Sequence, residues 1–190
     1  MNIVLATGNP HKAEELQQML GASVVPAPPG FDVEETGTTL LQNALLKAHA
    51  LRGDVDPRHL VLADDSGLAV HALDGRPGVY SARYAGPDAT YADNNRLLLT
   101  ELDGVDDRRA AFVCVLVALD GAGGVRMGCG VCPGTIAHEL RGDGGFGYDP
   151  VFLVAGDHRS MAELSPLEKN AVSHRGRAAR MLSAALEAAA

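Results

Sequence analysis

The sequence predicts an α/β fold in which helices flank a mixed central sheet. Short apolar runs of strand length alternate along the chain with longer segments whose apolar residues recur at helical spacing. The glycine-rich stretch 121–124 joins two of the apolar runs, which predicts an antiparallel pair within the sheet. Because 190 residues with 46% hydrophobic content can bury a core of their own, we expect a single domain over residues 1–190.

The composition argues against several classes of protein. A formal charge of −8 disfavours nonspecific binding to nucleic acid, which requires a basic face. We expect no membrane partner and a cytoplasmic location, because no apolar stretch is long enough to span a bilayer and the N-terminal run lacks a basic leader. Three cysteines argue against a disulfide scaffold, and Cys129 and Cys132, although spaced like a redox motif, lack its strand-then-helix setting.

The first predicted unit is a strand at 2–6, a glycine turn and a helix. Asn9 is a favourable N-cap, and the proline after it suits the first helical position. Lys12 is unexpected in the first turn, where the helix dipole favours acidic side chains. A bound anion would compensate it, so the Thr7 hydroxyl, the backbone N–H groups around Gly8 and Asn9, and Lys12 form a candidate phosphate site. The alternative is a capped helix with a solvated lysine.

The next elements are a short strand at 24–25, an acidic loop and a second helix. The loop carries a pair of glutamates at 34–35. A capping box and an apolar stripe predict the helix over 39–53. On that helix Asn43 and Lys47 lie four residues apart and share one face.

The stretch 61–68 combines an apolar run with two adjacent carboxylates, Asp64 and Asp65. We expect a strand that ends in a turn at this acid pair, because neighbouring anions repel each other and are costly to bury. A divalent cation would compensate them, and oxygen ligands suit Mg²⁺. If the glutamates at 34–35 lie opposite, four carboxylates converge on one site. The alternative is a solvated turn.

Further elements follow in the second half of the chain. A capping box of Thr90 and Asp93 predicts a helix start. In residues 110–119, the side chains that would point to either face of a strand are apolar, which predicts a central strand covered on both faces. Residues 125–132 are predicted to form a returning strand beside it. Arg83 lies between two tyrosines, where it contacts a phosphate or a nucleobase, or stacks within its own loop.

The stretch 142–152 is rich in glycine and aromatic residues. Glycines on both sides of Phe146 let the backbone approach a ligand while the ring offers a stacking face. Asp149, held extended by the following proline, is a candidate hydrogen-bonding group for a base. The alternative is a glycine-rich hairpin with aromatic residues in the core.

Two more helices are predicted towards the C-terminal end. The first carries Lys169, and the second turns Met181 inward. His174 and Arg175 are basic residues at the start of the second helix, which repeats the anomaly of Lys12. Basic residues at two helix starts, where acidic ones are favoured, suggest that both helix starts bind one anionic ligand.

Six ordered motifs span nearly the whole chain. They are Thr7-Gly-Asn-Pro-His-Lys12, Glu34-Glu-Thr-Gly37, Ala63-Asp-Asp-Ser-Gly-Leu68, Pro77-Gly-Val-Tyr-Ser-Ala-Arg83, Gly144-Gly-Phe-Gly-Tyr-Asp-Pro150 and Glu168-Lys-Asn-Ala-Val-Ser-His-Arg175. Together they resemble the inosine/xanthosine triphosphate pyrophosphatase family, whose members remove non-standard purine nucleotides.

The resemblance implies two lobes around a nucleotide-binding cleft, a mixed α/β sheet and a homodimer. It also implies Mg²⁺-dependent hydrolysis of ITP, dITP and XTP to the monophosphate and pyrophosphate, which cleanses the nucleotide pool and prevents misincorporation into DNA and RNA. Glu35 and Asp65 would hold the Mg²⁺ ion, and Asp65 would also accept the proton of the attacking water.

The other implied roles concern the substrate. The residues that would hold the triphosphate are Thr7, Gly8, Asn9 and Lys12, assisted by Lys169 and Arg175. The residues that would contact the rest of the nucleotide are Ser66, Phe146 as the stacking ring, its neighbours Gly147 and Tyr148, and Asp149, His174 and Arg175 around the edge of the base.

The sequence departs from this family at Leu40 and Gln42, where bacterial relatives often carry Phe and Glu. No role is therefore assigned to Asn43 and Lys47. Two competing functions stay open, namely a septum-type nucleotide pyrophosphatase that acts on other bases and a nucleotide sensor that releases no pyrophosphate.

Overall fold

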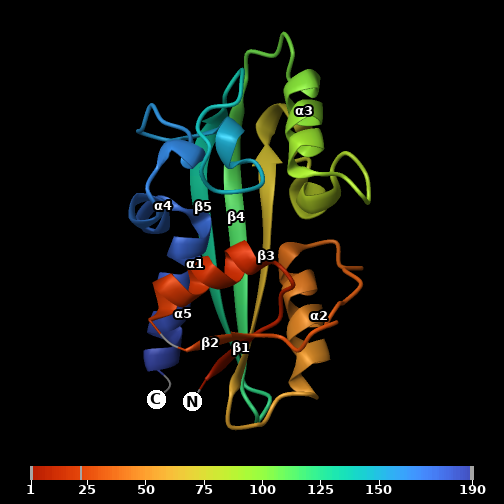
Figure 1. Ribbon diagram of the computed structural model, residues 1–190, viewed down its shortest axis with the longest axis vertical. Helices are drawn as coiled ribbons and strands as arrows, with labels where there is room; N and C mark the ends of the chain where they lie inside the picture. Colours follow the sequence, from red (N-terminus) through yellow and green to blue (C-terminus); the bar gives the residue numbers. More distant parts are fainter. Residues whose placement is uncertain (1, 22, 189–190) are drawn as a thin grey trace. The chain divides into compact units, whose positions relative to one another are not determined.

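A computed structural model describes residues 2–21 and 23–188 (Figure 1). Within those residues, the sheet has six strands in the order β2-β1-β3-β4-β5-β6. The strands are β1 (Ile3–Leu5), β2 (Val24–Pro26), β3 (Leu60–Val70), β4 (Arg109–Leu119), β5 (Val125–Ile136) and β6 (Phe152–Val154). The α-helices are α1 (Pro10–Leu20), α2 (Leu40–Arg52), α3 (Tyr91–Glu101), α4 (Pro166–Val172) and α5 (His174–Glu187). Short 3₁₀ helices are η1 (His71–Leu73), η2 (Gly78–Arg83), η3 (Asp149–Val151) and η4 (Met161–Glu163).

The sheet is mixed, as the sequence predicts. β1 runs parallel to both β2 and β3, whereas β5 and β6 are antiparallel. β4 and β5 are neighbours in the sheet and are joined by a tight turn, in which the Asp120 N–H donates to the Gly124 carbonyl at 3.0 Å. The predicted hairpin is therefore confirmed.

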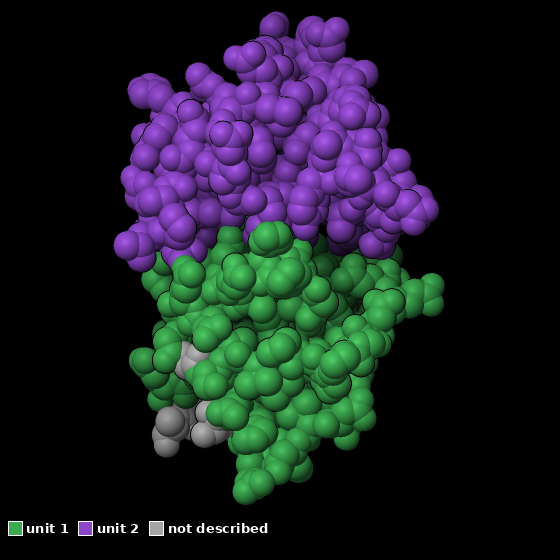
Figure 2. All heavy atoms as spheres, viewed as in Figure 1, with its two compact units in different colours: residues 1–65, 114–130, 174–190 green, residues 66–113, 131–173 purple. Residues whose placement is uncertain are grey.

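The chain divides into two compact units (Figure 2). Unit 1 comprises residues 1–65, 114–130 and 174–190, and unit 2 comprises residues 66–113 and 131–173. Three long strands, β3, β4 and β5, pass along the chain from one unit into the other. That the chain forms one domain with a nucleotide-binding cleft stays a prediction.

In unit 1, β3 separates two hydrophobic clusters. Leu60 and Leu62 lie in a cluster with apolar residues of α1 and α5. Val61 and Ala63 lie in the other cluster, with apolar residues of α2. Because successive strand residues point to opposite faces, α1 and α5 cover one face of this part of the sheet and α2 covers the other (Figure 1).

Unit 2 has a hydrophobic cluster of its own, built on the continuation of β3 at Leu68 and Val70. The rings of Phe112 and Phe152 meet there, with centroids 4.5 Å apart. Tyr148, from the glycine-rich stretch, is also buried in this cluster. Two aromatic residues of that stretch, Tyr148 and Phe152, therefore do belong to the core.

The helix starts confirm the sequence predictions. Asn9 caps α1 by accepting from two backbone N–H groups, and capping boxes begin α2 at Thr39 and α3 at Thr90. The predicted orientation of Met181 is wrong, because its side chain is 55% exposed while the adjacent Leu182 is buried. Leu182, which the same prediction placed on the inward face, is confirmed there.

None of the helices in the described part of the chain is both long and apolar enough to cross a bilayer. Cys129 is exposed and Cys132 is buried on β5, and neither is disulfide-bonded. Residues three apart on a strand face opposite sides, so the pair does not form a redox motif.

Candidate active site

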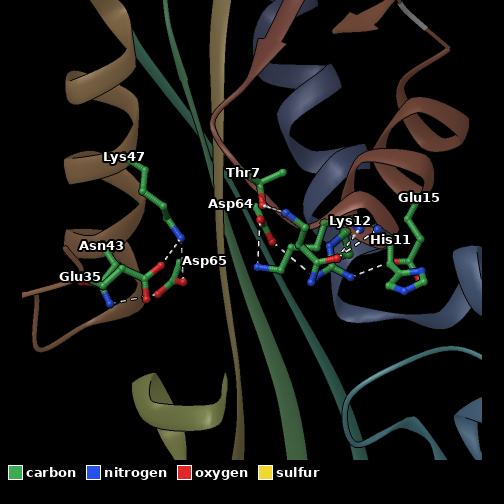
Figure 3. A network of polar contacts seen from close by, with 11 residues as sticks. Thr7, His11, Lys12, Glu15, Glu35, Asn43, Lys47, Asp64 and Asp65 are labelled. Carbon is green, nitrogen blue, oxygen red and sulfur yellow. Dashed lines mark hydrogen bonds and ion pairs between the residues drawn. The ribbon is translucent and has the colours of Figure 1, made fainter. Parts of the chain in front are cut away.

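The acid pair does not lie in a turn, so that prediction is wrong. β3 continues without a break through Asp64 and Asp65 to Val70. The alternation of the strand sends Asp64 to the face covered by α1 and α5 and Asp65 to the face covered by α2 (Figure 3). Both carboxylates are buried, and each meets basic groups on its own face, so the strand does not have to end. The two neighbouring carboxylates therefore belong to two different polar clusters.

The cluster on the α2 face joins Asp65 to Glu35. The Lys47 ammonium lies 2.7 Å from Glu35 Oε1 and 3.0 Å from Asp65 Oδ1. Asn43 Nδ2 donates to Asp65 Oδ2 at 3.3 Å, and Asn43 Oδ1 accepts from the Gly37 N–H at 2.8 Å. Glu35 and Asp65 thus converge on one cation, whereas the exposed Glu34 and the opposite-facing Asp64 do not join them. Of the four carboxylates, two therefore converge and two do not.

Within this cluster, burial and the opposite charge of the ion-pair partner shift the pKa values of Asp65 and Lys47 in opposite directions. Burial raises the pKa of Asp65, the ammonium of Lys47 opposes that rise, and the neighbouring Glu35 carboxylate adds to it. Burial alone would lower the pKa of Lys47, but Asp64, Asp65 and Glu35 outweigh it and raise this pKa. Lys47 is therefore held as a cation between the two carboxylates.

The cluster on the opposite face is built around Asp64, which is fully buried. Its Oδ1 lies 3.0 Å from the Lys12 ammonium, and its Oδ2 accepts from Arg175 Nη2 at 3.3 Å. Arg175 Nη1 donates to Glu15 Oε2 at 2.6 Å. Burial would raise the pKa of Asp64, but the positive charges of Lys12, Arg175 and Lys47 outweigh it and hold this pKa well below its usual range. The two helix starts with unexpected basic residues thus share an anion supplied by the chain itself.

The N-terminal turn lies at the start of α1. The Thr7 hydroxyl accepts from the Asn9 N–H at 3.1 Å, and the Asn9 side chain accepts from the N–H groups of His11 and Lys12. Gly8 is exposed at the tip of the turn. The turn lines a cavity of about 250 Å³, whose other wall is the proline-rich segment 26–31.

The other predicted site residues lie in unit 2. Asp149 Oδ2 accepts both from the Phe146 N–H at 2.8 Å and from the Lys169 ammonium at 2.6 Å. The same ammonium lies 4.8 Å from the centroid of the Phe146 ring. Tyr148 donates from its hydroxyl to the backbone carbonyl of residue 81 at 2.9 Å. The structure therefore brings Lys169 together with the predicted base-binding residues of its own unit.

The remaining predicted residues are placed by their own elements. Ser66 is half-buried on β3, at the start of unit 2. Gly147 has a φ of +64°, a conformation that favours glycine. His174 is buried at the first position of α5, in unit 1 beside Arg175.

Sequence reasoning missed three polar partners in unit 1. Lys47 and Asn43 bind Asp65 directly, and Glu15 binds Arg175. The signal for the first two was present, because Lys47 is one of only three lysines and shares a helix face with Asn43. Glu15 carries no such signal, because an acidic residue on a helix is ordinarily solvated.

The sequence also matches known proteins. The sequence model of the Ham1 family matches residues 3–185. The chain belongs to the Ham1 family. Its relatives include the dITP/XTP pyrophosphatase of Exiguobacterium sp., 46% identical over 97% of this chain and 96% of that protein. The dITP/XTP pyrophosphatase of Shigella flexneri is 48% identical over 97% of each chain.

Solved Ham1 structures have the same fold. The Ham1 protein of Staphylococcus aureus superposes with a TM-score of 0.89 at 40% identity, covering 100% of both chains. A HAM1 protein of Coxiella burnetii superposes with a TM-score of 0.86 at 41% identity, covering 99% of both chains. The α/β fold and the resemblance predicted from the six motifs are both confirmed.

Proposed function

We propose that this Ham1 chain hydrolyses the purine nucleoside triphosphates ITP, dITP and XTP to the monophosphate and pyrophosphate, with Mg²⁺ as cofactor, and so cleanses the nucleotide pool. The observation that carries the proposal is the convergence of Glu35 and Asp65 on a single cation. Two carboxylates directed at one point are suited to hold a catalytic metal ion, which nucleotide binding alone would not require. The names of the relatives, dITP/XTP pyrophosphatase, support the choice of substrate.

The residues of this cluster fit Mg²⁺. The ion prefers hard oxygen ligands and usually takes one or two carboxylates, with water and phosphate oxygens in its other positions. Glu35 and Asp65 supply two carboxylates. Among the residues that the structure describes, no group of three or more His, Cys, Asp or Glu side chains could hold a metal ion, so the other ligands of the ion would be water and phosphate oxygens. When bound, the ion would neutralise phosphate charge and lower the pKa of a coordinated water.

Asp65 is the proposed proton acceptor for the attacking water. Burial raises the pKa of its carboxyl group, whereas the charge of a bound Mg²⁺ would lower it, so the metal would share the activation of the water. Its two oxygens receive one hydrogen bond each, from Lys47 and from Asn43, and a carboxylate has about four acceptor positions. Asp65 therefore keeps capacity for a water or a metal while Lys47 and Asn43 hold its orientation.

The proposed triphosphate site is the start of α1. The exposed backbone of Gly8, the Thr7 hydroxyl and the Lys12 ammonium lie at the positive end of the helix dipole, which favours anions. Lys12 already pairs with the buried Asp64, so a phosphate would share this cation and would not meet it free. Arg175 is engaged by Asp64 and Glu15, so contact with substrate would require it to exchange one of these partners.

The proposed base site within unit 2 is the glycine-rich loop together with Ser66. That His174, which belongs to unit 1, contacts the base stays a prediction. One face of the Phe146 ring would stack on the base, with Gly147 and Tyr148 forming the adjoining backbone. A keto oxygen at the six-position accepts hydrogen bonds, so recognition of the base requires donors directed at that oxygen. The amino group of adenine would leave such donors unpaired, which costs about 1–3 kcal/mol and favours ITP and XTP over ATP.

We also propose a homodimer in the cytoplasm. Exposed apolar side chains on unit 1 support self-association, among them Val125, Met127 and Met181. Light scattering gives the mass of the particle in solution, and Met127→Glu tests whether this surface is the interface. A monomeric wild-type protein would refute the dimer.

The first experiment measures release of pyrophosphate from ITP, XTP, GTP and ATP by the purified protein, with and without Mg²⁺. We expect strong Mg²⁺-dependent cleavage of ITP and XTP and little cleavage of ATP and GTP. Cleavage directed at other bases would favour a septum-type pyrophosphatase. Binding of ITP without release of pyrophosphate would indicate a sensor and overturn the proposal.

The decisive variant is Asp65→Asn. It keeps the shape of the side chain but removes the proton acceptor, so we expect turnover to disappear while nucleotide binding largely survives. Asp54→Asn is the matched control, because Asp54 is exposed beyond the end of α2. Near-wild-type turnover by Asp65→Asn would remove this residue from the mechanism.

A second variant, Lys12→Ala, tests the triphosphate site. Loss of a charge that binds the ground state and the transition state alike raises KM more than it lowers kcat. We therefore expect a sharply higher KM for ITP. An unchanged KM would exclude Lys12 from the site.

A further inference from the structure

Helix α3 holds the glycine-rich loop of unit 2, although the proposed function assigns that helix no role. Asn95 Nδ2 donates to the Gly147 carbonyl at 2.8 Å. The ring of Tyr91 lies with its centroid 6.1 Å from that of Phe146, at an interplanar angle of 40°. Tyr91 and Asn95 are four residues apart on α3 and so share one face. One face of α3 therefore contacts two successive residues of the loop.

The chemistry of Asn95 suits a directing role more than a packing role. The side chain is only 4% exposed, and because its partner is a carbonyl, the nitrogen must face Gly147. Its Oδ1 is buried and has no hydrogen-bond partner among the described residues. An unpaired buried acceptor destabilises the folded protein. A leucine of similar volume would avoid that cost, but it would leave the Gly147 carbonyl without this donor.

The loop needs such a contact at Gly147. The residue has a φ of +64°, no side chain to pack, and no atom within 4 Å of the place that a Cβ would occupy. The residues on either side are tied down, Phe146 through its N–H to Asp149 and Tyr148 through its hydroxyl. Asn95 supplies the side-chain bond that sets the peptide between them.

Resting on the proposed function, we propose that Asn95 is a positioning residue for the purine base. By holding the Gly147 peptide, it keeps the Phe146 ring and the Asp149 carboxylate in the arrangement that the base requires. The ring of Tyr91 packs beside the same ring. The affinity for the base should therefore depend on this face of α3, and the affinity for the phosphate chain should not.

The test compares a ligand that has a base with one that has none. Calorimetric titration measures binding of inosine monophosphate and of inorganic tripolyphosphate to the wild type and to Asn95→Leu. We expect the affinity of the variant for inosine monophosphate to fall about tenfold, as when one positioning hydrogen bond is lost. Its affinity for tripolyphosphate should stay within about twofold, and in turnover the KM for ITP should rise more than kcat falls.

Asn94→Leu is the matched control on the same helix. Asn94 is also buried, accepts from the Ala85 N–H at 2.8 Å and donates to the Ala82 carbonyl at 3.1 Å. Its removal should lower the melting temperature at least as much as Asn95→Leu, because two hydrogen bonds are lost. It should leave the affinity for inosine monophosphate unchanged. Equal effects of the two variants on that affinity would reduce Asn95 to a structural residue.

The other outcomes separate the inference from the proposed function. Unchanged binding of inosine monophosphate by Asn95→Leu overturns the inference, and so does an equal loss for both ligands or a wild type that binds no inosine monophosphate. A wild type that binds this ligand but releases no pyrophosphate from ITP overturns the proposed function alone. If Asn95→Leu does not fold, Tyr91→Ala replaces it, because Tyr91 is 44% exposed. That variant should weaken binding of inosine monophosphate only, and unchanged affinity would again overturn the inference.

Discussion

The sharpest prediction about stability concerns Asp64→Asn. Asp64 is fully buried between Lys12 and Arg175, and the side chain of Arg175 is only 2% exposed. Asparagine keeps the shape but removes the charge, and loss of one partner of a buried pair costs about 3–5 kcal/mol. Because Glu15 still pairs with Arg175 and Lys12 reaches solvent, we expect the lower part of that range, about 3–4 kcal/mol.

Chemical unfolding by urea, followed by circular dichroism, measures this loss. For a chain of this size it corresponds to a melting temperature lower by roughly 6–16 °C. Asp56→Asn is the control, because its ion pair with Arg58 is exposed and should contribute nothing measurable. A variant within about 1 kcal/mol of the wild type would refute the view that Asp64 compensates the buried Arg175 and the half-buried Lys12.

The interaction of Asp64 with Lys12 and Arg175 also predicts that the stability of the protein depends on pH. The pKa of Asp64 is lowered in the folded protein, so its ionised form stabilises the fold above the ordinary value of 3.8. That contribution is lost as the pH falls from 3.8 through the folded pKa. The stability difference between the wild type and Asp64→Asn should therefore be constant near neutral pH and shrink below pH 3.8. A difference that stays constant in acid would contradict this assignment.

Two further predictions use neighbouring or matched residues. Arg108→Met removes donors to three backbone carbonyls, each at 2.7 Å, and should cost at least about 3 kcal/mol, whereas the exposed Arg109→Met should leave the melting temperature unchanged. Equal melting temperatures for the two variants would contradict this reading. Gly130→Ala would place a Cβ 2.0 Å from the His174 carbonyl oxygen and should destabilise the protein by about 1–3 kcal/mol, as measured by urea unfolding. Gly53→Ala, with no atom within 4 Å of the new Cβ, should be neutral, and a similar loss in both would refute the packing argument.

The sequence predicted local structure well because local structure depends on local chemistry. The caps at Asn9, Thr39 and Thr90 were readable because each side chain bonds to N–H groups two or three residues away. The mixed sheet followed from the turn at 121–124 and from the apolar runs. Errors arose where distant residues decide the outcome, as at Met181, whose exposure depends on what surrounds α5.

The acid pair shows where sequence reasoning stops. The residue types alone imply that Asp64 and Asp65 are costly to bury and need compensation. How they are compensated depends on the fold, because strand alternation separates the two side chains. Helices α1 and α5 bring Lys12 and Arg175 to Asp64, and α2 brings Lys47 to Asp65. The position of Lys47 between Glu35 and Asp65 has the same cause. Lys47 is 12 positions from Glu35 and 18 positions from Asp65 in the sequence, so these ion pairs depend on packing and not on sequence spacing.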